Sequence, residues 1–584
     1  MGDLKKVRQQ LAAFNASVES RVNEVRENPD EAKSLLEKWR EIQESVPEVE
    51  TPTGLKLPRL PLPLLDEPGA IARYLYGEGL PGEFPYLSSS YAEMYLDPMD
   101  PHEVPSEEPT RLFAGLGTAK DTNERFHFLT KNQRSHRMST AFDGPTLYGM
   151  DSDEPGVFGK IGEGGVAIDT VEDMEVLFAG FDLAAASTSV SMTINGPAPT
   201  IMAMFVAAAK RRFGDGVVEK LRGTVQADIL KEVQGQNEVL FPVQASLRFL
   251  LDMMEYSVMK IPRWYPVSIS GYHISQAGAT PVQQAAYTLS NGFAYAEMMR
   301  DRGLDVRDFA PRFSFFLDCG LDVEFMALAR ICRKIWAVGM RDVYGADQRG
   351  QKLKLHTQTS GRSLVAAEFK NNLTRTAVEL LMAYMNATNS CHSNSADEPF
   401  TTPSEEYVKL ASHAQSIMLE ESGLFRHMMN GVSGSPGMKA VERAVEQAIL
   451  EEFEEIDRLG GVLGAMEHRY QRSQIQASSH RYEQQIMENE RRIIGLNRYA
   501  EGVEHPEPQL VRISNERKEE QVLRIQDFKK RNQDKAGPAL ERLGQVVRSD
   551  GNVFEELIDT VETCTLGQIT KALQAEVGKF RPMM

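Results

Sequence analysis

Cysteine is scarce in this sequence, and its spacing excludes two kinds of protein. The 584-residue chain has four cysteines, and no two of them form a CxxC pair: Cys319, Cys332, Cys391 and Cys564. Scattered thiols of this kind indicate a reducing compartment, so we expect a cytoplasmic protein. A disulfide framework and a cysteine-based zinc site are both excluded.

Long apolar runs and excess positive charge are missing as well. No stretch approaches the ~20 apolar residues needed to cross a membrane. The start of the chain, MGDLKK, lacks the apolar core of a signal peptide. The formal net charge of −18 disfavours binding to nucleic acid, which requires a basic surface. We therefore expect no membrane association and no nucleic-acid partner.

The familiar catalytic and nucleotide-binding motifs are also absent. The GLG at 115–117 lacks the third glycine of a dinucleotide fingerprint, and GKIGEGG at 159–165 is not a phosphate loop. HExxH, GxSxG and the kinase motifs do not occur. His392 lies near Asp397 and Glu398, but no second ligand pair stands at a fitting spacing, so no metal site is expected.

What the chain does contain is arranged in three regions. Residues 1–65 begin with apolar positions at helical spacing, such as Leu4, Val7 and Leu11, and end in a proline-rich stretch at 52–63 that should run extended. This N-terminal arm either lies over a partner subunit or forms a surface tail. Residues 66–435 alternate short β-like runs with amphipathic helices, and residues 436–584 are mainly helical and charged.

The central region predicts the fold class. Its β-like runs alternate with helical stretches, and there are eight of them: 111–115, 137–143, 188–194, 223–227, 266–272, 312–317, 353–359 and 389–393. Strict alternation indicates a parallel sheet with right-handed crossovers. Eight units predict an α/β chain built on a (β/α)8 TIM barrel, with an N-terminal helical and extended arm and a C-terminal mainly helical region. An open doubly wound sheet is the alternative.

Polar side chains stand where several of these strands should end. His273 follows the run 266–272, and Gln226, Gln358 and Asn394 hold similar places along the chain. One such histidine alone is more often a core residue than a functional one. Several polar strand ends together indicate a barrel mouth, where catalytic groups converge.

The segments around these residues are distinctive in combination. They include Tyr272-His273 and five further motifs: SMTINGP at 191–197, GTVQADILKE at 223–232, LHTQTSG at 355–361, NSCHSNSADE at 389–398 and GGVLGAMEHRY at 460–470. Over roughly residues 80–500 the chain resembles the adenosylcobalamin-dependent acyl-CoA mutases. The resemblance implies a barrel threaded by the CoA chain. It also implies a radical rearrangement in which the thioester-bearing group migrates to the neighbouring carbon.

The resemblance also implies a role for individual residues. His273 and Gln226 would be catalytic, with His273 donating a hydrogen bond to the thioester carbonyl. The adenosyl group of the cofactor would be held by four residues: Gly115, Gln358, Asn394 and Glu398. Contacts to the acyl-CoA substrate are implied for a larger set: Tyr91, Ser139, Thr224, Arg312, Ser314, Phe316 and Ser390.

Two further positions bear on the choice of substrate. Phe113 and Gln236 stand where methylmalonyl-CoA mutases carry a tyrosine and an arginine that meet the free carboxylate of the substrate. A buried carboxylate without a cation is costly, so an acyl group without a free carboxylate is expected. This pair resembles isobutyryl-CoA mutase, which interconverts isobutyryl-CoA and n-butyryl-CoA. Ala141 disfavours 2-hydroxyisobutyryl-CoA, while pivalyl-CoA, isovaleryl-CoA and larger branched substrates stay open.

The chain shows no cobalamin-ligating Asp-x-His-x-x-Gly motif. We therefore expect a large subunit that pairs with a separate small cobalamin-binding subunit in a hetero-oligomer, with adenosylcobalamin held mainly by that subunit. A catalytically silent scaffold subunit is the alternative of another class. Such a chain should have lost the catalytic and ribose-binding side chains, yet His273 and Gln358 are present.

Overall fold

The computed structural model describes residues 3–95, 112–131, 135–400, 403–425, 431–500, 512–549 and 551–581. Its central feature is a run of parallel strands that pair in chain order. One five-stranded sheet has the order β3-β4-β5-β6-β7, and one four-stranded sheet has the order β11-β10-β9-β8. The strands are β3 (Leu112–Ala114), β4 (His136–Ala141), β5 (Thr188–Thr193), β6 (Gly223–Val225), β7 (Trp264–Tyr265), β8 (Val267–Ser270), β9 (Phe313–Cys319), β10 (Lys354–Thr359) and β11 (Ser390–His392).

The two sheets form one barrel wall. Between β7 and β8 stands Pro266, which has no N–H to donate and therefore interrupts the ladder. Beyond it, Ser268 N donates to Gln226 O at 3.0 Å, so β8 continues beside β6. At the other edges, the rings of Phe113 on β3 and His392 on β11 lie 5.5 Å apart, although no ladder joins these two strands in the described residues. Eight strand positions in parallel order confirm the predicted (β/α)8 fold.

Helices on the outside of the barrel follow the strands. Their starts carry the expected signals: α11 begins with a capping box formed by Thr280 and Gln283. The outer helices are α4 (Ala119–Thr130), α6 (Val171–Leu177), α7 (Ala198–Phe213), α9 (Val243–Lys260), α11 (Pro281–Asp301), α13 (Phe325–Asp342), α15 (Asn372–Met385) and α16 (Glu405–Ser416). Short helices lie between them: α5 (Gly144–Leu147), α8 (Ile229–Lys231), α10 (Tyr272–Gln276), α12 (Val306–Phe309) and α14 (Gln348–Gln351).

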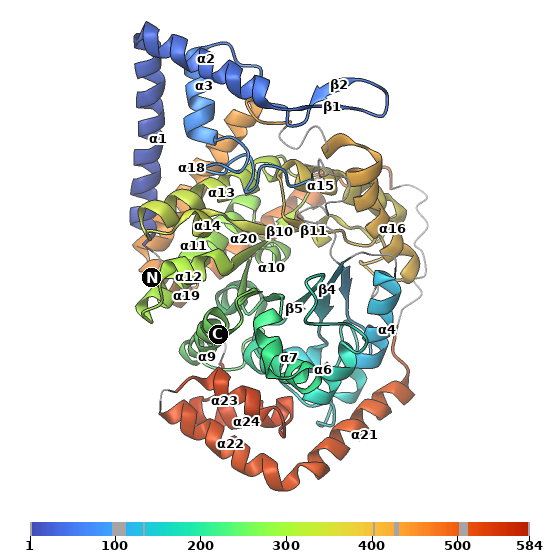
Figure 1. Cartoon of the computed structure of the whole chain (residues 1–584). Helices are drawn as coiled ribbons and strands as arrows, with labels where there is room; N and C mark the ends of the chain where they lie inside the picture. The colour runs from blue at the N-terminus through green and yellow to red at the C-terminus, as the bar shows by residue number, and fades with distance from the viewer. Residues whose placement is uncertain are drawn as a thin grey trace.

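The N-terminal arm is anchored at its start and has a small core of its own. Its elements are α1 (Leu4–Glu27), α2 (Pro29–Ser45), the antiparallel pair β1 (Glu48–Glu50) and β2 (Lys56–Pro58), and α3 (Pro68–Arg73). Leu4, Val7 and Leu11 are buried in the main core. Further along, Trp39 packs edge-on against Tyr74 with ring centroids 5.5 Å apart. Figure 1 shows α1 to α3 at one end of the molecule.

The C-terminal region divides between two faces of the barrel. One helix, α18 (Pro436–Arg458), packs on α1, α11 and α13. It is followed by α19 (Gly461–Glu467) and α20 (Tyr470–Met487). At the end opposite the arm, α23 and α24 contact α7 (Figure 1), and this group comprises α21 (Asn515–Arg531), α22 (Gln533–Arg548), α23 (Val553–Thr560) and α24 (Leu566–Val577). In the described residues, no helix combines the length and apolar character of a membrane span.

Candidate functional site

A cavity of about 780 Å³ runs inside the barrel. Most barrels of this kind are filled by branched aliphatic side chains. Here the inward positions carry small hydroxyl residues, which leave the space open: Ser139, Ser189, Ser191, Thr224, Ser268, Ser314 and Ser390. Tyr91, Phe113, Arg312 and Phe316 also line it. The structure therefore brings the sequence-predicted substrate residues together, with the exception of Gln236.

One end of the cavity is strongly basic. Arg222 directly precedes β6, Arg263 precedes β7 and Arg312 precedes β9, so their side chains gather where the strands begin. Four more cations line the same cavity: Arg137, Arg349, Lys352 and Lys354. None of the described lining residues is Asp or Glu. This end therefore favours an anionic ligand.

The other end presents neutral donors. Gln226 follows β6 and lines the cavity. Its Oε1 accepts a hydrogen bond from Asn195 Nδ2 at 3.0 Å, while Asn195 Oδ1 is occupied by the backbone N–H of Asp228. With its oxygen engaged from behind, the Gln226 amide presents its N–H groups to the cavity.

His273 lies beside this cavity wall on α10, directly after β8. Its Nδ1 is 2.7 Å from Ser270 Oγ, and its ring meets Phe316 edge-on at 5.8 Å. Burial lowers the pKa of His273 well below its usual value, and the Lys231 ammonium lowers it further. When the Ser270 hydroxyl donates to Nδ1, the neutral ring carries its proton on Nε2 and can donate from there. His273 itself does not line the cavity in this structure.

A second cavity of about 320 Å³ adjoins the first and shares Phe113, Gln358 and His392 with it. Gly115 and Glu398 also line this space. Asn394 does not, but its Oδ1 accepts a 2.7 Å hydrogen bond from Gln358 Nε2, which also donates to Tyr272 OH at 2.9 Å. The four predicted cofactor residues are thus close together.

The second cavity fits a ribose-bearing group. At Gly115 a Cβ atom would stand 2.2 Å from the carbonyl oxygen of Ala141, so a larger residue would displace the wall. The amides of Gln358 and Asn394 and the carboxyl of Glu398 are suited to sugar hydroxyl groups.

Gln236 belongs to a buried cluster next to His273. It follows α8, and its Oε1 accepts from Lys231 Nζ at 2.6 Å. Lys231 Nζ also lies 2.5 Å from Glu232 Oε1, and both of these side chains are fully buried. Gln236 Nε2 donates to Glu238 Oε1 at 3.2 Å.

Apart from Arg312, the residues that support the site were not predicted from the sequence. The basic group had a visible signal, since arginine directly precedes the strand runs at 223, 264 and 313. Asn195 and Lys231 carried no such signal, because each lies inside a motif noted for its other members. His356 and His392 line the cavity as well, and His356 Nδ1 contacts Ser390 Oγ at 2.7 Å.

Comparison with known proteins agrees with this geometry. The family described as methylmalonyl-CoA mutase matches residues 65–579. A fused isobutyryl-CoA mutase of Geobacillus kaustophilus is 44% identical over 586 residues, which cover 95% of this chain and 53% of that protein. Another, from Cupriavidus metallidurans, is 45% identical over 91% of this chain and 50% of its own length. The 2-hydroxyisobutanoyl-CoA mutase large subunit of Aquincola tertiaricarbonis is 35% identical over 86% of this chain and 88% of its own.

The comparison corrects two expectations from the sequence. The chain spans about half the length of the fused relatives, which align with nearly all of it. Because these relatives are fused mutases, the expected hetero-oligomer with a separate small cobalamin-binding subunit is wrong. The expectation that adenosylcobalamin is held mainly by such a subunit is wrong for the same reason. With a family match over most of its length, this chain belongs to the methylmalonyl-CoA mutase family.

Proposed function

We propose that this chain binds an acyl-CoA along the barrel axis and rearranges the carbon skeleton of a branched acyl group that has no free carboxylate. Isobutyryl-CoA, converted to n-butyryl-CoA, is the substrate we favour, and adenosylcobalamin is the cofactor. The observation that carries the proposal is the polarity of the cavity, which has cations at one end and neutral donors at the other.

Acyl-CoA has the matching polarity. Its phosphates would meet Arg222, Arg263 and Lys352 at the strand starts, where charge-assisted hydrogen bonds are strong. The pantetheine arm would pass the serine-lined wall. A strand such as β9, with seven residues, spans roughly 20 Å, which suits an extended arm. The thioester would then arrive at the neutral end.

At that end, Gln226 and His273 would donate hydrogen bonds to the thioester carbonyl. Both are held in position by partners behind them, so they lower the barrier without reorganising. Adenosylcobalamin, when bound, supplies a carbon radical by homolysis of its cobalt–carbon bond. Gln358 and Asn394 would hold its ribose. The barrel wall would exclude water from the reacting carbon.

Phe113 and Gln236 support an uncharged acyl group. Phe113 turns an apolar ring to both cavities, and Gln236 offers an amide that cannot neutralise a carboxylate. Relatives at 42% to 45% identity are named fused isobutyryl-CoA mutases. Pivalyl-CoA, isovaleryl-CoA or a larger branched acyl-CoA are the next candidates. A 2-hydroxyisobutyryl-CoA substrate is less favoured, because Ala141 offers its hydroxyl no polar partner. A silent scaffold is disfavoured by the intact donor set.

The test is rearrangement in the presence of adenosylcobalamin, followed by chromatography of isobutyryl-CoA and n-butyryl-CoA. Pivalyl-CoA, isovaleryl-CoA and 2-hydroxyisobutyryl-CoA are compared as competing substrates. Phe113→Tyr together with Gln236→Arg should weaken turnover of the uncharged substrates, since both changes make the pocket more polar. Absence of rearrangement with every branched acyl-CoA would contradict the proposal.

A further inference from the structure

Glu238 is a buried carboxyl group for which the proposed reaction has no use. Its side chain is 9% exposed. Its Oε1 accepts from Gln236 Nε2 at 3.2 Å, and the side chain of Asn195 hydrogen-bonds the same carboxyl. Since Asn195 also bonds Gln226, the Glu238 carboxyl joins the residue at position 236 to one of the two proposed thioester donors.

The charges around Glu238 do not leave it a cation of its own. The Lys231 ammonium is 2.5 Å from Glu232 and is shared with the Gln236 amide. Glu232 Oε2 also accepts the backbone N–H of Glu238 at 2.8 Å, which holds the two carboxyls close together. Burial raises the pKa of Glu238 to about 7, with Glu232 as the second cause.

This cluster is next to the proposed thioester site. A Cβ built on Gly235 would lie 3.9 Å from the carbonyl oxygen of His273. The Lys231 ammonium is near enough to lower the pKa of the His273 ring. An acyl group bound at His273 would therefore lie within range of the charges in this cluster.

We propose that Glu238 is a specificity-determining residue, which acts through position 236 to exclude acyl-CoA substrates that carry a second carboxylate. The proposal rests on the function proposed above and deepens it. A substrate carboxylate near Gln236 would meet the carboxyl groups of Glu232 and Glu238. At a pH above 7, where Glu238 is ionised, such juxtaposed like charges are costly. A cationic side chain introduced at position 236 would pair with Glu238 first and would not be available to the substrate.

The experiment compares four proteins: the unaltered chain, Gln236→Arg, Glu238→Gln, and the two changes together. Methylmalonyl-CoA and isobutyryl-CoA are titrated into each by isothermal calorimetry at pH 8, above the pKa of about 7 of Glu238. We expect Gln236→Arg alone to gain little affinity for methylmalonyl-CoA. The double variant should bind it at least ~10-fold more tightly than Gln236→Arg does, because the guanidinium is then free to meet the substrate. Gln236→Arg with Glu175→Gln is the matched control, since Glu175 pairs with Arg211 on an outer helix.

The single variant Glu238→Gln provides a second, independent test. Removing one negative charge should raise affinity for methylmalonyl-CoA several-fold relative to isobutyryl-CoA, and circular dichroism should show an unchanged fold. Equal affinity of Gln236→Arg and the double variant for methylmalonyl-CoA would overturn the proposal. It would also be overturned if Glu238→Gln left the ratio of the affinities for methylmalonyl-CoA and isobutyryl-CoA unchanged. Failure of the proposed function has a different signature, because the unaltered chain would then neither bind nor convert isobutyryl-CoA.

Discussion

Single residues in this site are prepared by neighbours that do not touch the substrate themselves. Asn195 engages the oxygen of Gln226, and Ser270 engages Nδ1 of His273. The Gln226 amide is thereby held in the orientation that presents a donor, and the Ser270 contact leaves Nε2 as the nitrogen with which His273 can reach the substrate. A donor fixed in advance is worth more in a dry cavity than in water, because nothing has to rearrange as charge develops on the carbonyl oxygen.

The first prediction concerns these donors. His273→Ala should lower the kcat for isobutyryl-CoA by a factor of ~10² to 10³, the usual effect of losing one oxyanion donor. Ser270→Ala should cost less, about 10-fold, because the donor remains but its tautomer is no longer selected. Steady-state kinetics should show the loss mainly in kcat, with KM little changed. Ser549→Ala, at the end of α22, is the control, and an unaltered rate in His273→Ala would exclude its role.

At the scale of elements, the strands give the cavity its polarity. Cations precede β6, β7 and β9. Neutral polar residues stand at the other end of the strands: Gln226 follows β6, His273 lies just beyond β8, and Gln358 is close to the end of β10. Parallel strands place all their starts at one end of a barrel and all their finishes at the other. In the sequence, a basic residue, a strand and a polar residue follow one another repeatedly. In the folded barrel, the basic residues therefore gather at one end of the cavity and the neutral polar residues at the other.

The second prediction tests this polarity. Arg263→Ala and Lys352→Ala should each raise the KM for isobutyryl-CoA by about 10-fold, as expected for loss of one charge-assisted contact to phosphate. For S-isobutyryl-pantetheine, which lacks the nucleotide phosphates, the same variants should have the same KM as the unaltered protein. Lys220→Ala is a matched surface control. Equal effects on both substrates would show that the phosphates do not bind at the strand starts.

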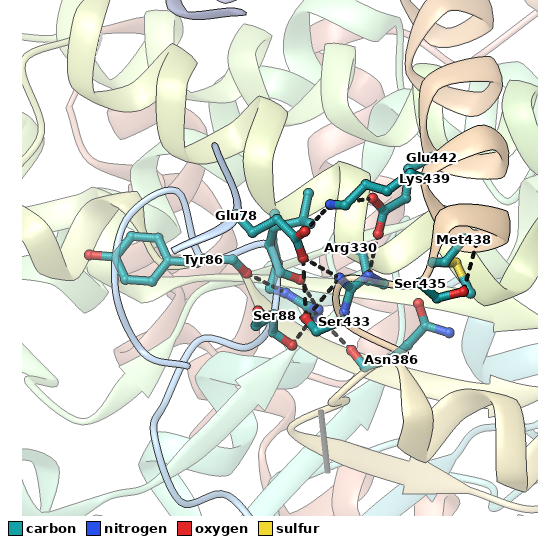
Figure 2. Close-up of polar contacts among 12 residues, drawn as sticks. Glu78, Tyr86, Ser88, Arg330, Asn386, Ser433, Ser435, Met438, Lys439 and Glu442 are labelled. Atoms are coloured by element: carbon teal, nitrogen blue, oxygen red, sulfur yellow. Dashed lines mark hydrogen bonds and ion pairs between the residues drawn. The ribbon is translucent and has the colours of Figure 1, made fainter. Parts of the chain in front are cut away.

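Across the whole molecule, two buried arginines on α13 join distant segments. Figure 2 shows Arg330 between Glu78, which follows the N-terminal arm, and Glu442 of α18. Arg330 Nε is 2.6 Å from Glu442 and its Nη2 is 3.2 Å from Glu78. The neighbouring Arg333 donates to the backbone carbonyls of four residues: Tyr86, Leu87, Ser88 and Asn386. These contacts hold the segment that leads to Tyr91 against the barrel.

The third prediction is that Arg330→Met destabilises the protein. Among the described residues, Lys439 would then be the one cation paired with the buried Glu78 and Glu442, and breaking a buried pair costs ~3 to 5 kcal/mol. Thermal or urea unfolding should reveal a lowered midpoint. Arg458→Met removes an exposed pair with Glu455 and should leave the unfolding midpoint nearly unchanged. Equal midpoints for the two variants would argue against a structural role for the Arg330 cluster.

A second buried cluster joins the barrel to the C-terminal helices. Asp169 accepts from Ser152 N at 2.8 Å and from Gln521 Nε2 at 2.7 Å, while Lys529 pairs with Asp151 and Arg524 with Asp173. Burial raises the pKa of Asp169 well above its usual value, and the charges of Asp173 and Asp151 raise it further.

The fourth prediction follows from the sign of this shift. A carboxyl whose pKa is higher in the folded state contributes stability below its unfolded pKa of about 3.9, and that contribution is lost as pH rises through the folded pKa. Asp169→Asn removes this dependence. Raising the pH from 5 to 8 should therefore lower the melting midpoint of the unaltered protein more than that of Asp169→Asn. Asp527→Asn, on the exposed face of α21, is the control, and a pH-independent difference for Asp169→Asn would contradict the assignment.

The strand positions and much of the candidate site could be predicted because both are local properties. Short apolar runs between turn residues mark β3 to β11, and each of the eight predicted runs overlaps a strand position of the barrel. His273, Gln226 and Gln358 could be placed because a residue at the end of a strand, or just beyond it, lies at the barrel mouth. Asn195 and Glu238 could not, since their importance comes from contacts with residues that are distant in the sequence.

By itself, the sequence determined the order of strands and helices, the absence of a cationic residue at position 236 and the placing of polar groups after strands. These depend on residue type and spacing along the chain, which are the same before and after folding. The tertiary structure alone decided which side chains share one space. It showed that small hydroxyl residues leave the barrel open, that the cations meet at one end, and that Glu238 lies beside Gln236. Charge and burial act over a few ångströms, and only the folded chain sets those distances.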